Sequence, residues 1–301
     1  MLYKGGIVRM LREQKGMSQE ELADGICSIA TLSKIENGMQ APGWSRFEAF
    51  LEKLGEDPRK YTFAMDKNEY EAIQLEYDIS ELFDQRKYKK AETLVNKLEE
   101  LKNLDVQSEK FVCFSRVFLD YANGTDIKDT IQDLEDILNS TLEQFKEDKL
   151  NNVFLTKNEI RFLNFLAVCY ASTDKGKSIK LLYAIKNYIE ARIIDKVIFA
   201  NQYVLIAYNL SKQLGLVEEH EEALEVAEQG IKWANRYSRG LSNYAGLILN
   251  KACCMIETDT DLEEAIELLQ LSYSFFKFRG SKDNCKAIIT YATDKNIDLK
   301  F

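Results

Sequence analysis

Apolar residues recur three and four positions apart along almost the whole chain, which is the spacing of helices that bury one face. Strong β-hairpin signals are absent. The only two prolines, Pro42 and Pro58, lie in the first 60 residues, so nothing beyond them forbids helix. The pattern predicts an all-α protein.

The sharpest local pattern lies between residues 17 and 38. Ser18 is a suitable N-cap, and Glu21 three residues later completes a capping box, which predicts the start of a helix. Gly25 then ends the first helix and allows a turn, and Ser28 caps a second helix. The segment therefore predicts two short helices joined by a tight turn.

The second short helix has two distinct faces. Leu32 and Ile35 point toward a core, and Gly38 supplies the left-handed residue that ends the helix. The residues left facing outward are Ile29, Ala30, Ser33, Lys34 and Asn37. This face is short and small and carries one positive charge, which suits entry into the major groove of DNA. Capping, turn and core spacing together favour a helix-turn-helix over a plain helical hairpin.

From about Asn68 onward, the chain repeats a helix, a turn and a second helix that begins with a small residue. The second helices start near Ala91, Ile131, Ser178, Ala223 and Ala265, which are 40, 47, 45 and 42 positions apart. This period exceeds the roughly 34 residues of a tetratricopeptide repeat but suits helical repeats in general. Because one helix pair cannot bury its apolar face alone, about five pairs are expected to stack into a superhelix with a concave inner surface.

The C-terminal piece is expected to cap this stack. Residues 272–284 and 287–294 fit a last helix pair, and the interpretation adopted for Phe275, Phe276 and Phe278 is that they fill its core.

The net charge of −9 is unevenly distributed. Residues 1–60 hold nine Lys or Arg and nine Asp or Glu, so the acidic excess lies entirely in the remainder. Because residues 1–60 carry no net charge, each monomer is expected to make few phosphate contacts. DNA binding should therefore depend on dimerisation and on salt. The acidic remainder of the chain is expected to be repelled by nucleic acid, so its surface is available for another partner.

The cysteines do not indicate a metal site. The six cysteines show no CxxC spacing, and His220 is the only histidine, so neither zinc nor any other cofactor is expected. Cys27 lies at the start of the second short helix, where a thiol switch is an alternative interpretation. No signal peptide or long apolar run is found, so the expected compartment is the cytoplasm, with reduced thiols.

Residues 7–55 resemble the five-helix helix-turn-helix domain of the lambda/434 repressor and XRE class. The matching signature consists of Arg12, Gly16, Ser18, Gln19, Leu22, Ala23, Ile35, Glu36, Asn37 and Gly38. The resemblance implies a buried ion pair between Arg12 and Glu36, and a phosphate contact from Gln19. It implies DNA contacts by Ser18, Gln19, Ser28, Ile29, Ala30, Thr31, Ser33, Lys34 and Asn37. Ile29 and Ala30 offer only apolar contacts, for instance to thymine methyl groups, so the operator sequence does not follow from them.

The whole chain resembles the peptide-pheromone-responsive regulators of Gram-positive bacteria, the PlcR/Rgg/PrgX group, with the PlcR branch nearest. The body resembles degenerate tetratricopeptide repeats in a right-handed superhelix, and Ile26-Cys27 and the Phe-Phe-rich tail match the PlcR branch. The resemblance implies a helix-turn-helix domain at 1–62, a linker helix at 63–76 and a peptide-binding and dimerisation domain at 77–301. In this group a short exported and reimported peptide binds the concave groove and alters dimer geometry and operator affinity.

The expected peptide contacts lie on the first helices of the repeats. Aligning Ala167 and Ala207 with the small residue at position 8 of a tetratricopeptide repeat predicts which residues face the concave groove. That set comprises Arg161, Asn164 and Val168, then Asn201, Val204 and Tyr208, with Gln202 as the competing frame for Asn201 and with Asn250 uncertain by one residue. An Asn amide both donates and accepts, so it can pair with the backbone of an extended peptide. Arg161 suits a terminal carboxylate.

The sequence offers two alternative functions. The repeats could be a protein-docking or oligomerisation surface with no peptide ligand. A phosphatase, as among related repeat proteins, is disfavoured because there is one histidine, no Gly-rich phosphate loop and no recognisable carboxylate pair. The sequence therefore predicts a homodimeric regulator of double-stranded DNA, and not an enzyme.

Overall fold

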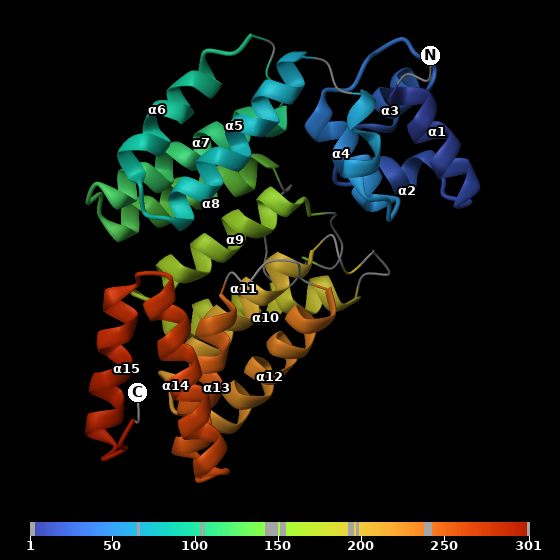
Figure 1. Ribbon diagram of the computed structural model, residues 1–301. Helices are drawn as coiled ribbons and strands as arrows, with labels where there is room; N and C mark the ends of the chain where they lie inside the picture. The colour runs from blue at the N-terminus through green and yellow to red at the C-terminus, as the bar shows by residue number, and fades with distance from the viewer. Residues whose placement is uncertain are drawn as a thin grey trace. The chain divides into compact units, whose positions relative to one another are not determined.

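The computed structural model describes residues 4–64, 67–102, 104, 106–141, 150, 155–191, 196, 199–237 and 243–299. Every regular element in these ranges is a helix (Figure 1), which confirms the all-α prediction. The chain forms two compact units: Met1–Cys169 with Ala191–Ile198 make up unit 1, and Tyr170–Glu190 with Phe199–Phe301 make up unit 2. The division falls between the two helices of the third predicted repeat.

Unit 1 begins with the helix-turn-helix head. Its elements are α1 (Lys4–Gln14), α2 (Gln19–Ala23), α3 (Ile29–Glu36), α4 (Trp44–Lys53) and the 3-10 helix η1 (Pro58–Ala64). Leu32 and Ile35 are fully buried in a core that also contains Leu22, Phe47 and Phe50. The predicted inward face of the second short helix is therefore confirmed.

Local hydrogen bonds begin and end these helices as the sequence predicts. The Ser18 side chain accepts a hydrogen bond from the Glu21 amide at 3.1 Å, and the Ser18 amide donates to the Glu21 carboxylate at 2.7 Å. Gly25 and Gly38 adopt φ values of 74° and 73°, which residues with a Cβ rarely tolerate. The capping box and both turn glycines are thus confirmed.

Five further helices complete unit 1. They are α5 (Lys67–Asp84), α6 (Tyr88–Glu99), α7 (Val106–Ala122), α8 (Ile127–Thr141) and α9 (Lys157–Tyr170). α5 packs on α6 and α7, and α7 packs on α8. Aromatic rings join α7 to α9, since Phe114 stacks on Phe162 with ring centroids 4.0 Å apart. A capping box between Thr156 and Glu159 sets the start of α9.

Unit 2 contains the remaining helices. They are α10 (Lys175–Ala191), α11 (Ala200–Gly215), α12 (His220–Tyr237), α13 (Tyr244–Glu257), α14 (Leu262–Phe278) and α15 (Lys282–Asp294). Sequential neighbours pack most closely, α11 on α12 and α13 on α14. All five predicted second-helix starts lie in α6, α8, α10, α12 and α14, so the repeat prediction is confirmed.

The C-terminal cap differs from the prediction. Residues 272–278 continue α14, because nothing in its sequence breaks a helix before Gly280, which turns the chain with a φ of 72°. One helix, α15, follows in place of a helix pair. Phe276 does pack into the C-terminal core, but Phe278 is 91% exposed, so its assignment to the core was wrong. Within the described ranges, no helix is long and apolar enough to cross a membrane.

Gly246 of α13 lies close to α11. A Cβ atom placed there would lie 2.4 Å from the ring of Tyr208 on α11, which is far inside van der Waals contact. We therefore expect Gly246→Ala to lower the free energy of unfolding by about 1–3 kcal/mol through overpacking. Urea unfolding in a Trp44→Phe background reports on unit 2, because Trp233 is then the only tryptophan.

The matched control is Gly215, the last residue of α11, where an added Cβ would meet nothing within 4 Å. Gly215→Ala should be neutral or stabilising, since it reduces the freedom of the unfolded chain without a clash. Equal losses of stability in the two variants would contradict this packing.

Candidate DNA-binding and peptide-binding sites

The outer face of α3 is open to solvent. Ile29 is 48% exposed, Ala30, Lys34 and Asn37 are exposed, and Ser33 is half-buried. The predicted outward orientation of this face is confirmed, and its contact with DNA stays a prediction.

Two serines predicted to contact DNA first serve as helix caps. Ser28 accepts a hydrogen bond from the Thr31 amide at 3.2 Å, and the two hydroxyls lie 2.8 Å apart. Ser18 caps α2 in the same manner. The Ser18 hydroxyl still has its proton to donate to a phosphate, and the Ser28 hydroxyl has its proton to donate when Thr31 is the donor in their pair.

A buried ion pair fixes α3 against α1. Arg12 donates from Nε to Glu36 Oε1 at 2.6 Å and from Nη2 to Glu36 Oε2 at 2.9 Å, and Glu36 is 3% exposed. Arg12 also donates from Nη1 to the carbonyl of Met17 at 2.9 Å. This two-point geometry sets the angle of α3, and it confirms the pair implied by the resemblance.

Both members of this pair are ionised. Burial alone would raise the pKa of Glu36, but hydrogen bonds from Arg12 and Gln19 outweigh it and lower that pKa. The hydrogen bond to Glu36 in turn raises the pKa of Arg12 above its usual range. The charge pair is therefore maintained at neutral pH.

Gln19 takes part in the same network. Its Nε2 donates to Glu36 Oε2 at 2.7 Å. Of the two amide N–H groups, only the second can therefore donate to a phosphate. The sequence prediction assigned Gln19 to DNA alone, and the structure adds the orientation of Glu36 to its roles.

Cys27 packs against the core of the head and is half-buried. Burial raises the pKa of its thiol, which keeps the thiol protonated at neutral pH and lowers its reactivity. The thiol-switch interpretation therefore receives no support from this environment.

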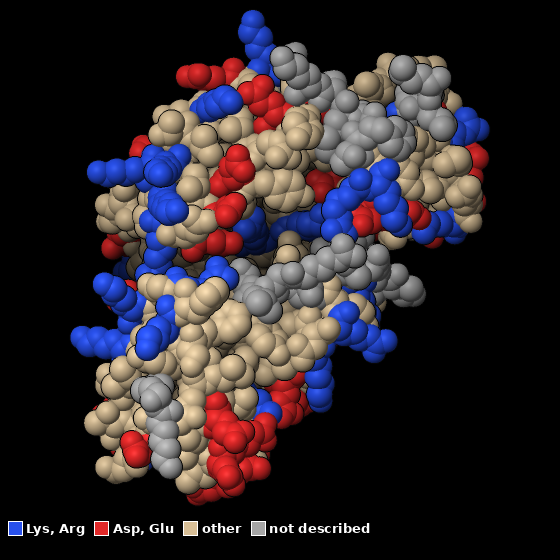
Figure 2. Space-filling view, viewed as in Figure 1, with Lys and Arg blue, Asp and Glu red and all other residues tan. Residues whose placement is uncertain are grey.

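Charge is distributed unevenly over unit 2 (Figure 2). Acidic side chains gather at the end where α13 turns into α14, with Asp259, Asp261, Glu263 and Glu264 all exposed. Such a surface repels the phosphate backbone.

Three of the residues predicted to face the peptide lie in unit 1, on α9. Arg161 donates from Nη1 to the Ser80 hydroxyl of α5 at 2.6 Å, and burial lowers its pKa. Asn164 is 8% exposed, and Val168 is exposed. Arg161 therefore ties α9 to α5 in addition to any role toward a ligand.

The other predicted contacts lie in unit 2, on α11 and α13. Asn201 is exposed, Gln202 and Tyr208 are half-buried, and the Tyr208 ring lies against Gly246. Asn250 donates from Nδ2 to the Tyr208 carbonyl at 3.0 Å and to the Ser211 hydroxyl at 2.8 Å. Its amide thus joins α13 to α11.

One predicted groove residue in unit 2 lies elsewhere. Val204 was expected on the inner surface, and the structure buries it to 1% exposure. The reason is that the apolar face of α11 is wide, with Tyr203 and Ala207 buried beside it.

Sequence reasoning missed the polar partners of α9. Lys157 pairs with Glu48, 109 positions away, and Arg161 with Ser80, 81 positions away. No local spacing signals a contact of this range.

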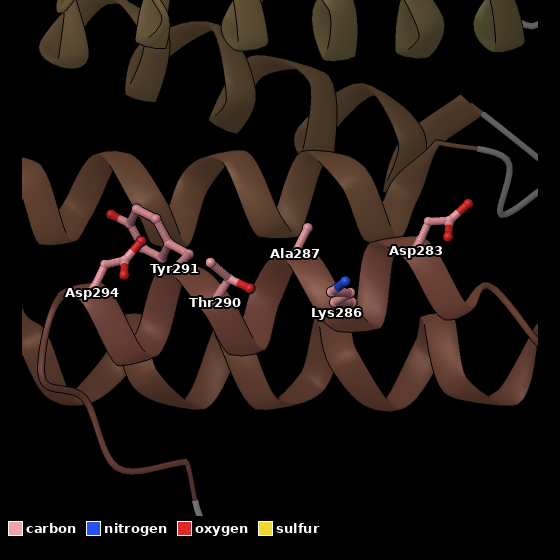
Figure 3. A pocket seen from close by; sticks show the side chains of 6 residues that line it. All are labelled: Asp283, Lys286, Ala287, Thr290, Tyr291 and Asp294. Atoms are coloured by element: carbon pink, nitrogen blue, oxygen red, sulfur yellow. The ribbon is translucent and has the colours of Figure 1, made fainter.

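A shallow hollow of about 460 Å³ lies along α15 (Figure 3). It is lined along a single helix by Asp283, Lys286, Ala287, Thr290, Tyr291 and Asp294, and none of these is a predicted peptide contact. The Tyr291 hydroxyl is already bonded to Glu257 at 2.9 Å, which secures α15 to α13. The hollow is therefore an open helix face beside a structural contact.

Solved structures share this fold over nearly the whole chain. PlcR from Bacillus thuringiensis, in complex with the peptide PapR7 and DNA, gives a TM-score of 0.64 at 19% identity, covering 96% of this chain and 99% of that chain. PlcR in its apo form gives 0.61 at 19% identity, covering 95% and 98%. The competence regulator ComR from Streptococcus vestibularis, in complex with its cognate signaling peptide XIP, gives 0.55 at 13% identity, covering 98% of each chain.

Family profiles match two successive parts of the chain. No curated protein matches the chain significantly. A helix-turn-helix profile matches residues 8–61, and a profile described as the RNPP family C-terminal domain matches residues 76–292. Because the second match spans more than half of the chain, and the first covers the head, this protein belongs to the RNPP family and carries an N-terminal helix-turn-helix domain.

Proposed function

We propose that this protein is a sequence-specific transcription regulator whose repeat domain binds a short signalling peptide, and that the peptide alters dimer geometry and DNA affinity. The observation that carries the proposal is an exposed α3 face, held by a buried ion pair, in a chain that also carries the RNPP domain. The similar PlcR structure was solved with both a peptide and DNA, which supports the same pair of partners here.

On the DNA side, two copies of the chain place one α3 each in successive major grooves. Half-sites should then lie about one helical turn apart, as for other helix-turn-helix dimers. The acidic body contributes no phosphate contacts, so affinity should fall steeply with salt and with loss of the dimer. The site of action is the cytoplasm, where the operator lies.

On the peptide side, the proposed contacts are Asn164 in unit 1 and Asn201, Gln202, Tyr208 and Asn250 in unit 2, whose amide or hydroxyl groups can pair with the backbone of an extended peptide. Arg161 provides positive charge for a terminal carboxylate. The peptide must bind two arrangements of the dimer with different affinity, since equal affinity would shift nothing.

A second candidate is a regulator whose repeats dock a protein and take no peptide. The internal hydrogen bonds of Asn250 and Arg161 favour it, because both side chains already have structural partners. Neither candidate requires catalysis, and we propose that the chain is not an enzyme.

Binding of labelled synthetic peptides, taken from small reading frames beside the gene, separates the two candidates. The full chain should bind one of them, and Asn164→Ala should weaken that binding about tenfold, the effect of one lost hydrogen bond to a desolvated backbone. Fluorescence anisotropy of the peptide gives the dissociation constant.

The control is Asn139→Ala, because Asn139 is exposed on α8, a second helix of the repeats. This variant should bind the peptide as the unaltered chain does. Unchanged affinity in Asn164→Ala would contradict the groove assignment, and failure of every peptide to bind would favour the docking surface.

A further inference from the structure

An ion triad joins the head to the repeats within unit 1. Lys157, at the first position of α9, lies 2.6 Å from Glu52 Oε1 and 3.1 Å from Glu48 Oε1, both on α4. The Glu52 side chain is 2% exposed and those of Lys157 and Glu48 are about a quarter exposed. An ion pair this well buried is costly to break from one side only.

Two further contacts also connect the head to the repeats within unit 1. The Ser45 hydroxyl of α4 lies 3.3 Å from that of Ser108 on α7, and Lys4 of α1 pairs with Glu69 of α5. The outer face of α3 takes no part in these contacts and stays exposed. The contacts that hold the head against the repeats therefore leave the outer face of α3 exposed.

The triad is unbalanced in charge, with two carboxylates facing one ammonium group. Burial raises the pKa of Glu52 to about 7, although Lys157 opposes this shift. Burial also disfavours the charge on Lys157, but Glu48 and Glu52 together outweigh it and raise its pKa. Removing Glu52 would leave a neutral pair, whereas removing Lys157 would leave two carboxylates facing each other.

We propose that Lys157 is a positioning residue for DNA binding: through Glu48 and Glu52 it fixes α4 against α9, and so sets the orientation in which the repeats present α3 to the operator. The inference rests on the proposed function for its link to a ligand. One helical turn after Lys157, α9 carries Arg161, which is bonded to Ser80 of α5. A peptide that engages Arg161 and Asn164 therefore acts on the same helix that holds the head.

The direct test is the tumbling of the head, which Trp44 on α4 reports. In a Trp233→Phe background Trp44 is the only tryptophan, and its time-resolved anisotropy shows whether the head rotates with the repeats or alone. Lys157→Met should shorten the long correlation time severalfold. Lys157→Arg and Glu52→Gln should retain it, and the exchange Lys157→Glu with Glu52→Lys should restore it.

The control for loss of a positive charge is Lys89→Met, because Lys89 is exposed on α6. It should leave the correlation time unchanged. If Lys157→Met unfolds the head, the emission of Trp44 shifts to the red, and the exchange variant then decides the question. Unchanged tumbling in a folded Lys157→Met variant, or failure of the exchange to restore it, would overturn the proposal.

The functional readout is the ratio of operator dissociation constants without and with peptide. Lys157→Met should bring this ratio to within about twofold of one while peptide affinity is retained, because a ligand with no differential effect on the head shifts nothing. If the unaltered chain itself shows no peptide response, the proposed function fails, and the anisotropy decay still decides the role of Lys157.

Discussion

Arg12→Met is expected to lower the free energy of unfolding of the head by about 3–5 kcal/mol, because it leaves the buried carboxylate of Glu36 without its positive partner. Glu36 is 3% exposed and receives two hydrogen bonds from Arg12. The hydrogen bond from Gln19 would then remain, but Gln19 carries no positive charge. Since small domains have little stability to spare, operator binding should be lost together with the fold of the head. Urea unfolding followed by Trp44 in the Trp233→Phe background measures this loss.

The control is Arg9→Met on the same helix, because Arg9 pairs with Glu13 at an exposed position. Exposed pairs of this kind contribute little, so Arg9→Met should change stability only slightly. The double variant Arg12→Met with Glu36→Leu should recover much of the loss, since no buried charge remains. A loss in Arg12→Met no larger than that in Arg9→Met would contradict the role of the pair.

The stability of the head should depend on pH with opposite signs in the unaltered chain and in Arg12→Met. In the unaltered head the pKa of Glu36 is lowered from its usual 4.5, so the pair stabilises the head above that pH and the contribution is lost as pH falls through the lowered value. In Arg12→Met, burial without the pairing raises that pKa, so protonation should restore stability as pH falls. A stability profile between pH 7 and pH 3 distinguishes these signs.

Lys34→Ala is expected to weaken operator binding by about 1–3 kcal/mol, which is roughly fivefold to 150-fold, if Lys34 contacts a base edge. Lys34 is the one positive charge on the exposed face of α3. The head carries no excess of positive charge that could compensate for the loss of Lys34. The decrease in operator affinity should therefore be large for a single side chain. Anisotropy of a labelled operator duplex at several salt concentrations gives both the affinity and the salt slope.

The salt slope tells which contact Lys34 makes. If Lys34 contacts a phosphate, the variant should lose about one unit of slope and weaken uniformly across sequences; if it contacts a base, specificity at one position relaxes. Lys89→Ala, an exposed lysine on α6, is the control and should leave both quantities unchanged. Equal operator affinity in Lys34→Ala and the unaltered chain would remove α3 from the proposed interface.

Features set by neighbouring residues could be predicted from the sequence. The capping box of Ser18 and Glu21 and the burial of Leu32 and Ile35 depend on spacings of three residues, and the structure confirms them. The pair of Arg12 and Glu36 bridges 24 positions and came only from the family resemblance. Phe278 was wrongly assigned to the core because periodicity does not tell where the last turn of a helix leaves its neighbours.

Features that depend on distant partners could not be predicted. Asn250 was chosen for its amide chemistry, but whether that amide faces a ligand or a neighbouring helix depends on Tyr208 and Ser211, about 40 positions away. The triad of Lys157, Glu48 and Glu52 has the same character. Buried polar pairs of this kind follow from the tertiary structure, and no sequence spacing identifies them.

The most direct test of the central claim is the operator dissociation constant of the full chain, measured with and without saturating peptide. We expect the two values to differ, and by linkage the affinity for the peptide should change by the same factor when operator is present. That reciprocal change would show that DNA and peptide act on one equilibrium. Identical operator affinity at saturating peptide would contradict a peptide-gated regulator.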